Sequence, residues 1–240
     1  MGSLQSELPL HRGTWGGRRP GAGRRPGENP AVRHLSRERF QGRFPCHVTL
    51  KVRKDIPSLR RQRVIRELER SFTEGCERGD FRVVHYSIQS DHGHFIVEAA
   101  HREALGRGMK SLAARFARAV NRAFQRKGKV LTDRYHLRVL RSPRQVRNAL
   151  AYVLLNSRRH LAKRRGRSAL QGTALDPASS AVWFDGWARR KKSEGIGPGP
   201  RDGPVAPAVA LAHSWLLRLG WRRHGLIDPA EVPGLASRAA

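Results

Sequence analysis

Cysteine, acidic residues and long apolar runs are all scarce in this 240-residue chain. The two cysteines, Cys46 and Cys76, form no CxxC pair, which argues against a zinc finger and a disulfide framework. Both are expected to be small buried apolar residues. No apolar run approaches the length of a membrane span, and arginine and glycine occupy the N-terminus, where a signal peptide needs an apolar core. We therefore expect a cytoplasmic protein without membrane contact.

The shortage of acidic residues leaves a large positive charge. Nineteen Asp and Glu stand against 48 Lys and Arg, so the formal net charge is +29. Such an excess opposes compaction and attracts polyanions, and the planar arginine side chain suits phosphates and base edges. The charge predicts a nucleic-acid partner and a nucleoid-associated location. A ribosome-associated protein, or a merely composition-biased basic one, is the alternative.

Composition divides the chain into three regions. Residues 1–42 are rich in Arg, Gly and Pro and are predicted to be a disordered basic arm. Apolar residues concentrate in 43–162, which is predicted to be the catalytic domain. Residues 163–240 are predicted to be a C-terminal extension, with a linker over about 195–207 and a short helix over about 208–226. The arm arginines expected to contact DNA are Arg18, Arg19, Arg24 and Arg25.

Apolar spacing predicts the order strand, helix, strand, strand, helix, strand, helix. The corresponding ranges are 46–53, 58–78, 81–89, 92–99, 103–126, 130–140 and 143–159. Ser90 and Asp91 are expected to form a tight hairpin, and Ser142 is expected to cap the last helix before Pro143. This order is typical of an α+β, ferredoxin-like (split βαβ) antiparallel sheet with helices on one face and an appended C-terminal catalytic helix.

The second predicted helix carries a basic face opposite its apolar side. We expect this face to follow DNA phosphates, because it contains five cations and no acid; a merely solvated face is the alternative. The five residues are Arg107, Lys110, Arg115, Arg118 and Arg122.

Two histidines stand two residues apart in a predicted strand. His92 and His94 therefore share one face of the sheet. Neutral imidazole is a common metal ligand, so the pair predicts a site for Mg²⁺ or Mn²⁺, although a polar strand face would show the same spacing. Asp91 and Glu98 are candidates to orient the imidazoles from behind.

Tyr152 and Asn156 lie four residues apart in the last predicted helix and so share one side of it. A tyrosine hydroxyl attacks phosphate only when a cation or base activates it, which a nearby metal would provide. Tyr152 is thus the candidate nucleophile and Asn156 the candidate third ligand. Tyr135, which adjoins His136, is the main rival nucleophile; Tyr86 falls in mid-strand, where packing is expected.

The runs His92-Gly93-His94, Asp133-Arg134-Tyr135-His136 and Asn148 to Asn156 resemble the single-tyrosine HUH transposases, and among them the REP-associated tyrosine transposases of bacteria. The resemblance covers roughly residues 40–162. It implies cleavage and joining of single-stranded DNA beside hairpins, a metal held by two histidines and a helix amide or acid, and a 5′ phosphotyrosine intermediate. One departure is Gly93, because a bulky apolar residue usually stands there and anchors the strand in the core.

Two other functions remain open from the sequence. A noncatalytic ferredoxin-like module can bind nucleic acid through exposed aromatic residues, but the strands here lack the aromatic-rich RNA-binding pattern. A replication-initiator or plasmid-nicking nuclease can carry the same histidine motif. The quaternary state is expected to be a monomer or a homodimer.

Overall fold

The computed structural model describes residues 40–166, 168–170, 174–188 and 207–234. Almost all of the predicted basic arm and linker lie outside these ranges. All four arm arginines predicted to contact DNA also lie outside the described residues: Arg18, Arg19, Arg24 and Arg25. Among the described residues, no helix is both long enough and apolar enough to cross a membrane.

One five-stranded sheet, in the order β2-β3-β4-β1-β5, forms the centre of the described structure. Its neighbouring strands all pair antiparallel, and β4 lies between β1 and β3. This confirms the predicted ferredoxin-like, split βαβ arrangement, to which β2 adds a short edge. The strands are β1 (Cys46–Lys51), β2 (Glu77–Arg78), β3 (Phe81–Ile88), β4 (His92–Ala99) and β5 (His136–Val139).

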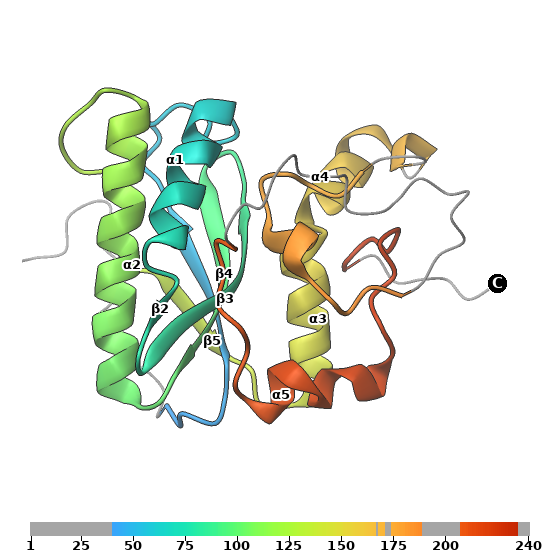
Figure 1. Ribbon diagram of the computed structural model, residues 1–240. Coiled ribbons are helices and arrows are strands. Elements are labelled where there is room, and N and C mark those ends of the chain that lie inside the picture. Colours follow the sequence, from blue (N-terminus) through green and yellow to red (C-terminus); the bar gives the residue numbers. More distant parts are fainter. Residues whose placement is uncertain (1–39, 167, 171–173, 189–206, 235–240) are drawn as a thin grey trace, which may run out of the picture. The chain divides into compact units, whose positions relative to one another are not determined.

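Helices cover both faces of this sheet. Two of them, α1 and α2, pack together on one face, and α3 packs on the other, against β3 and β4 (Figure 1). The α-helices are α1 (Gln62–Thr73), α2 (Arg102–Ala123), α3 (Pro143–Leu154), α4 (Asn156–Arg165) and α5 (Trp215–Arg218). Short 3-10 helices are η1 (Ser168–Leu170), η2 (Ser180–Trp183) and η4 (Gly220–His224).

Some element boundaries differ from the predicted ones. The first helix ends at Thr73 rather than near residue 78, because residues 77–78 pair with β3 as β2. The helix predicted over 143–159 is interrupted at Leu155. Its two parts pack in different places: α3 joins the core around Ile96, whereas Ala162 of α4 packs with Leu170 and Val232.

The pairing register divides the side chains of β1 and β4 between the two faces. Thr49 pairs with His94, and Val48 pairs with Phe95. Because side chains alternate along a strand, Val48 and Phe95 join the core under α1 and α2, whereas Thr49 and His94 face α3. The predicted histidine strand thus presents its imidazoles to the helix that carries Tyr152.

The start of α3 follows the predicted capping pattern. The Ser142 hydroxyl accepts a hydrogen bond from the backbone N–H of Gln145 at 3.3 Å, and Pro143 is the first helical residue. The apolar stripe of α3, which includes Val146 and Val153, packs on the sheet. Tyr152 is only partly buried at the edge of this stripe.

The described segments after residue 174 pack against the rest of the structure. Asp176 accepts two hydrogen bonds of 2.8 Å from the Arg60 guanidinium, and Glu231 accepts two, of 2.6 and 2.7 Å, from Arg147. The Trp221 side chain is buried in the core under α3. The C-terminal part therefore completes the cover of the α3 face.

Candidate active site

The His92 and His94 imidazoles converge on the α3 face of β4. Their Nε2 atoms are 3.0 Å apart. Two ligands about 2.1 Å from an octahedral ion, at right angles to one another, are also separated by about 3.0 Å. The two nitrogens therefore have the spacing of neighbouring ligands on one divalent ion.

The other ring nitrogen of each histidine already has a partner. His92 Nδ1 lies 2.7 Å from Asp91 Oδ1, and His94 Nδ1 lies 3.1 Å from Thr49 Oγ1 and 3.2 Å from His47 Nε2. A metal-binding imidazole generally uses its second nitrogen in this way, which fixes the ring orientation and leaves Nε2 for the ion. The pattern fits the predicted metal pair.

Burial keeps two imidazoles at this site neutral, those of His94 and His47. It lowers the pKa of His94 to about 2, with further contributions from His47 and His92. It likewise lowers the pKa of His47 to about 4, assisted by Arg138. A ligating imidazole must be neutral, so His94 needs no deprotonation near neutral pH before it can bind a cation.

Tyr152 lies next to these histidines. The centroid of its ring is 5.1 Å from that of His94 and 5.8 Å from that of His47. The Arg159 guanidinium carbon lies 5.2 Å from the centroid of the tyrosine ring. Helix α3 thus places the Tyr152 ring beside the histidine pair, and Arg159 of α4 adds a cation next to that ring.

The two rival tyrosines pack against the core on the opposite side of the sheet. Tyr86 is fully buried there, and its hydroxyl donates to Glu69 Oε1 at 3.1 Å. Tyr135 is partly buried against the same core. Both rings therefore lie on the side of the sheet away from the histidine pair and Tyr152.

Asn156 is the first residue of α4 and is fully buried. Neither polar atom of its side chain has a hydrogen-bond partner within the described structure. Burying a carboxamide without a partner is costly, so this amide oxygen is an acceptor available to a ligand. In the part of the chain that the structure describes, no group of three or more His, Cys, Asp or Glu side chains is placed to hold a metal ion.

The two acids predicted to orient the histidines have different roles. Asp91 contacts His92, as described above. Glu98 instead accepts hydrogen bonds of 2.8 Å from the backbone N–H groups of His213 and Ser214. It lies four residues beyond His94, or about 13 Å along the strand. The orienting role predicted for Glu98 is therefore wrong, because this carboxylate holds the C-terminal segment.

Sequence reasoning missed several residues at this site. His47 and Thr49 support His94 from β1; their strand was recognisable from its alternation, but its pairing with β4 was not. His160 shares a cavity of about 390 Å³ with His92. Burial, followed by the charge of His92, lowers the pKa of His160. The sequence signal available for His160 was its position about two helical turns after Tyr152.

The predicted basic face of α2 is not uniform. Arg107 pairs with Asp80, and Arg122 pairs with Glu67 at 2.9 Å. The Arg115 side chain is only 16% exposed and donates to the Ser71 carbonyl at 3.2 Å. The remaining two cations, Lys110 and Arg118, are exposed. The face is therefore partly a set of contacts between neighbouring elements.

Gly93 is buried between the two histidines, on the side of the sheet covered by α1 and α2. A Cβ atom there would lie 2.9 Å from the Phe95 ring and 3.2 Å from the Phe116 ring. These two rings occupy the space that a bulkier residue would fill. The anchor missing from the histidine motif is replaced by aromatic packing.

Comparison with known proteins gives one family match and several distant structural similarities. Residues 42–154 match the family model described as "Transposase IS200 like". No curated protein is significantly similar to the chain. A solved REP-associated tyrosine transposase bound to a REP hairpin is similar at 14% identity and a TM-score of 0.45, over 62% of this chain and 82% of that one. A bacterial tRNA(His) guanylyltransferase (Thg1)-like protein in complex with GTP is similar at 14% identity and a TM-score of 0.36, over 55% and 68%.

Both structural similarities are too distant to assign an activity. The family match stands independently of them and includes both histidines and Tyr152. Through residues 42–154, the chain therefore belongs to the IS200-like transposase family.

Proposed function

We propose that this transposase cuts and rejoins single-stranded DNA, with Tyr152 as the nucleophile and Mg²⁺ or Mn²⁺ as the cofactor. The observation that carries the proposal is the convergence of two imidazole Nε2 atoms, 3.0 Å apart, beside the Tyr152 ring. Each part serves phosphodiester cleavage: a cation site, a hydroxyl and a nearby arginine.

His92 and His94 would hold the metal, with Asn156 as a third ligand. The partnered Nδ1 atoms and the unpartnered buried amide support this set. A bound divalent cation polarises a scissile phosphate and offsets charge on the leaving oxygen. Asp91 and Thr49 keep the two imidazoles oriented, so the site is preorganised before DNA binds.

Tyr152 carries out the covalent step. Its phenolic oxygen loses a proton and attacks the phosphorus, so an O–P bond to tyrosine forms and the bond to the 3′ oxygen breaks. The leaving oxygen takes up a proton and becomes a free 3′ hydroxyl, while the protein keeps the 5′ phosphate as phosphotyrosine. The guanidinium of Arg159, beside the ring, is placed to offset negative charge that develops on the phosphate.

The reverse step joins strands. A 3′ hydroxyl attacks the phosphotyrosine, and tyrosine leaves with its oxygen. The link retains the energy of the phosphodiester bond, so rejoining needs no ATP. Single-stranded DNA with hairpins is the proposed substrate: the net charge of +29 supports a nucleic-acid partner, and the resemblance to REP-associated transposases supports the hairpin.

The test is an SDS-resistant protein–DNA adduct, formed with Mn²⁺ on a single strand that carries a hairpin. Tyr152→Phe should lose the adduct but keep the fold, since only one oxygen is removed. Tyr135→Phe is the matched control and should keep both. An adduct that persists in Tyr152→Phe and vanishes in Tyr135→Phe would show that the nucleophile is Tyr135. DNA binding without any adduct in the wild type would favour the noncatalytic alternative.

A further inference from the structure

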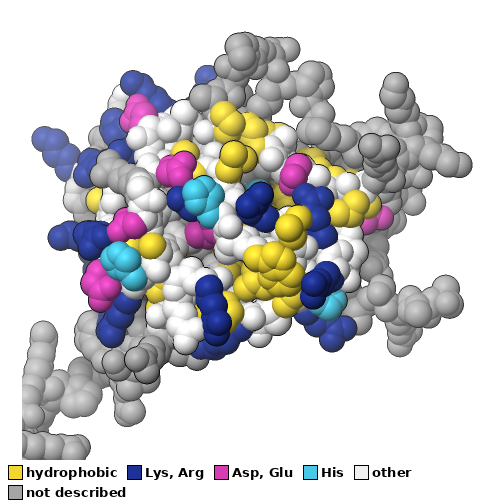
Figure 2. All heavy atoms as spheres, turned by 60° about the horizontal axis from the view of Figure 1, so that its bottom comes forward, with side chains coloured by type: hydrophobic (Ala, Val, Ile, Leu, Met, Phe, Trp, Pro, Cys, Tyr) yellow, Lys and Arg dark blue, Asp and Glu magenta, His cyan; other side chains and the backbone are white. Residues whose placement is uncertain are grey.

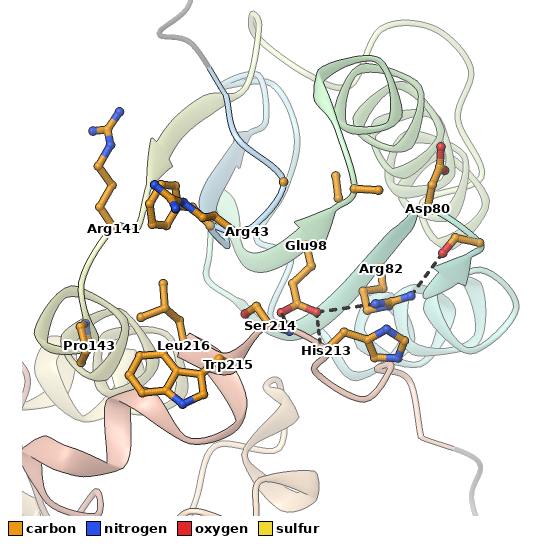
Figure 3. Close-up of a pocket in the computed structure, with 15 residues that line it drawn as sticks. Arg43, Asp80, Arg82, Glu98, Arg141, Pro143, His213, Ser214, Trp215 and Leu216 are labelled. Atoms are coloured by element: carbon orange, nitrogen blue, oxygen red, sulfur yellow. Dashed lines mark hydrogen bonds and ion pairs between the residues drawn. The ribbon is translucent and has the colours of Figure 1, made fainter.

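A second cavity lies at the other end of α3 from Tyr152. Its volume is about 810 Å³, and its walls include Phe44, Ala99, Pro143 and Leu216 (Figure 3). Pro143 opens α3, and nine residues of helix, about 14 Å, separate it from Tyr152. The cavity is thus distinct from the histidine site, yet on the same side of the sheet.

The wall of this cavity combines apolar surface with arginine. Trp215 lines it and remains 48% exposed, which is unusual for the largest apolar side chain. The Arg223 guanidinium carbon lies 4.9 Å from the centroid of the Trp215 ring, and Arg43 lies 4.8 Å from that of Phe44. Exposed aromatic rings next to arginines are what single-stranded nucleic-acid sites use to stack bases and contact phosphates.

The acids at this cavity already have partners. Glu98 accepts from the backbone of His213 and Ser214 and lies 3.8 Å from Arg82, as the dashed lines of Figure 3 show. Asp80 pairs with Arg107. Their charges are therefore offset locally, which leaves the exposed Arg43 to make the rim positive. The occupant that this charge suits is an anion with an apolar part.

The surrounding surface has the same character. On the face that carries α5 and the beginning of α3, apolar side chains gather and Lys and Arg side chains lie around them (Figure 2). A nucleotide matches this pattern, because it joins an apolar, stackable base to a negative phosphate. The cavity volume also falls in the range of about 300–1,000 Å³ typical of small-ligand sites.

We propose that this cavity binds one unpaired base of the DNA strand that the active site cuts. The base stacks on Trp215, and an adjoining phosphate contacts Arg43. This inference rests on the proposed function, because it places a second part of the same substrate. Residues 213–216 lie outside the family match, so the C-terminal segment adds this contact to the transposase core.

The experiment is an abasic scan of a labelled single strand, with affinity measured by fluorescence anisotropy. In the wild type, removing one particular base should weaken binding by between about 5- and 150-fold. Trp215→Ala should weaken the intact strand similarly and make it insensitive to that base. Trp215→Phe should largely preserve the sensitivity. Leu219→Ala, which removes another exposed apolar side chain of this segment, should preserve it fully.

The scan separates this inference from the proposed function, because it reads binding and not cleavage. If no abasic position matters, or if Trp215→Ala keeps the wild-type profile, the base site is refuted even where the adduct forms. If the profile depends on Trp215 but no adduct forms, the base site stands and the proposed cleavage fails. A thermal melt of Trp215→Ala that matches the wild type excludes unfolding as the cause.

Discussion

The two faces of the central sheet differ in chemistry although the same strands build both. On the α1 and α2 side, β1 and β4 contribute Val48, Leu50, Phe95 and other apolar residues to the larger core. On the α3 side, the alternate positions carry imidazoles and hydroxyls, with an apolar cluster only where α3 packs. One face thus supplies stability and the other presents reactive groups. If the pairing register of one of these strands shifted by one residue, its apolar side chains and its reactive side chains would exchange faces.

Removing a reactive group should give the largest effect. His92→Ala and His94→Ala should each lower divalent-dependent nicking by at least about 100-fold, since each deletes a direct ligand. DNA affinity should change little, because the arginines provide it. Nicking and binding are to be measured on the same oligonucleotide, with His101→Ala as an exposed control. Normal nicking in both variants would contradict the metal site.

Disturbing the apolar face should cost stability instead. A Cβ atom at Gly108 of α2 would overlap the Phe81 ring, whereas one at Gly106 would meet nothing. Gly108→Ala should lower the free energy of unfolding by about 1–3 kcal/mol, and Gly106→Ala should raise it by up to about 1 kcal/mol. Urea denaturation measures both changes. Equal effects of the two substitutions would show that α2 does not pack this closely on β3.

The buried histidine on β3 should make stability depend on pH. His85 lies against Phe184 on the α3 side, and burial lowers its pKa to about 4. Between this value and the unfolded pKa of about 6.5, the unfolded chain binds the extra proton. The free energy of unfolding should therefore fall with decreasing pH in that window, by up to about 1.4 kcal/mol per pH unit for this residue. Urea denaturation in chelator should show a shallower fall for His85→Gln, and an unchanged slope would refute its neutral burial.

The smallest effect is expected from the exposed cations of α2. Replacing Lys110 and Arg118 with Gln should flatten the dependence of log affinity on log salt by about 0.7 for each lost phosphate contact. Arg107→Gln and Arg122→Gln should change the salt slope less, because both side chains pair with acids of the protein. A salt slope that is identical in all variants would show that this face does not contact DNA.

The strand and helix order was predictable because alternation and four-residue spacing report burial directly. The shared face of His92 and His94, and the position of Tyr152 at the edge of the apolar stripe of α3, were predictable from the same local geometry. The support of His94 by His47 and Thr49 was not, because it depends on which strands pair. The aromatic packing at Gly93 was not predictable either, because it depends on Phe116, which lies in α2 rather than in the same strand.

The C-terminal part of the chain was the least predictable. Its elements are short, and its contacts are long-range: Glu98 with residues 213–214, and Arg147 with Glu231. Such pairs leave no periodic signal in the sequence. Glu98 was therefore predicted to orient the imidazoles, whereas its carboxylate holds the C-terminal segment.

We infer that DNA becomes covalently attached to the protein on the imidazole-bearing face of the sheet. The most direct measurement is mass-spectrometric mapping of the residue that carries a nucleotide after digestion of the wild-type adduct. We predict a 5′ phosphate on Tyr152, within the peptide that spans α3. A nucleotide on Tyr135, on Tyr86 or on any residue of the α1 and α2 side would contradict this account.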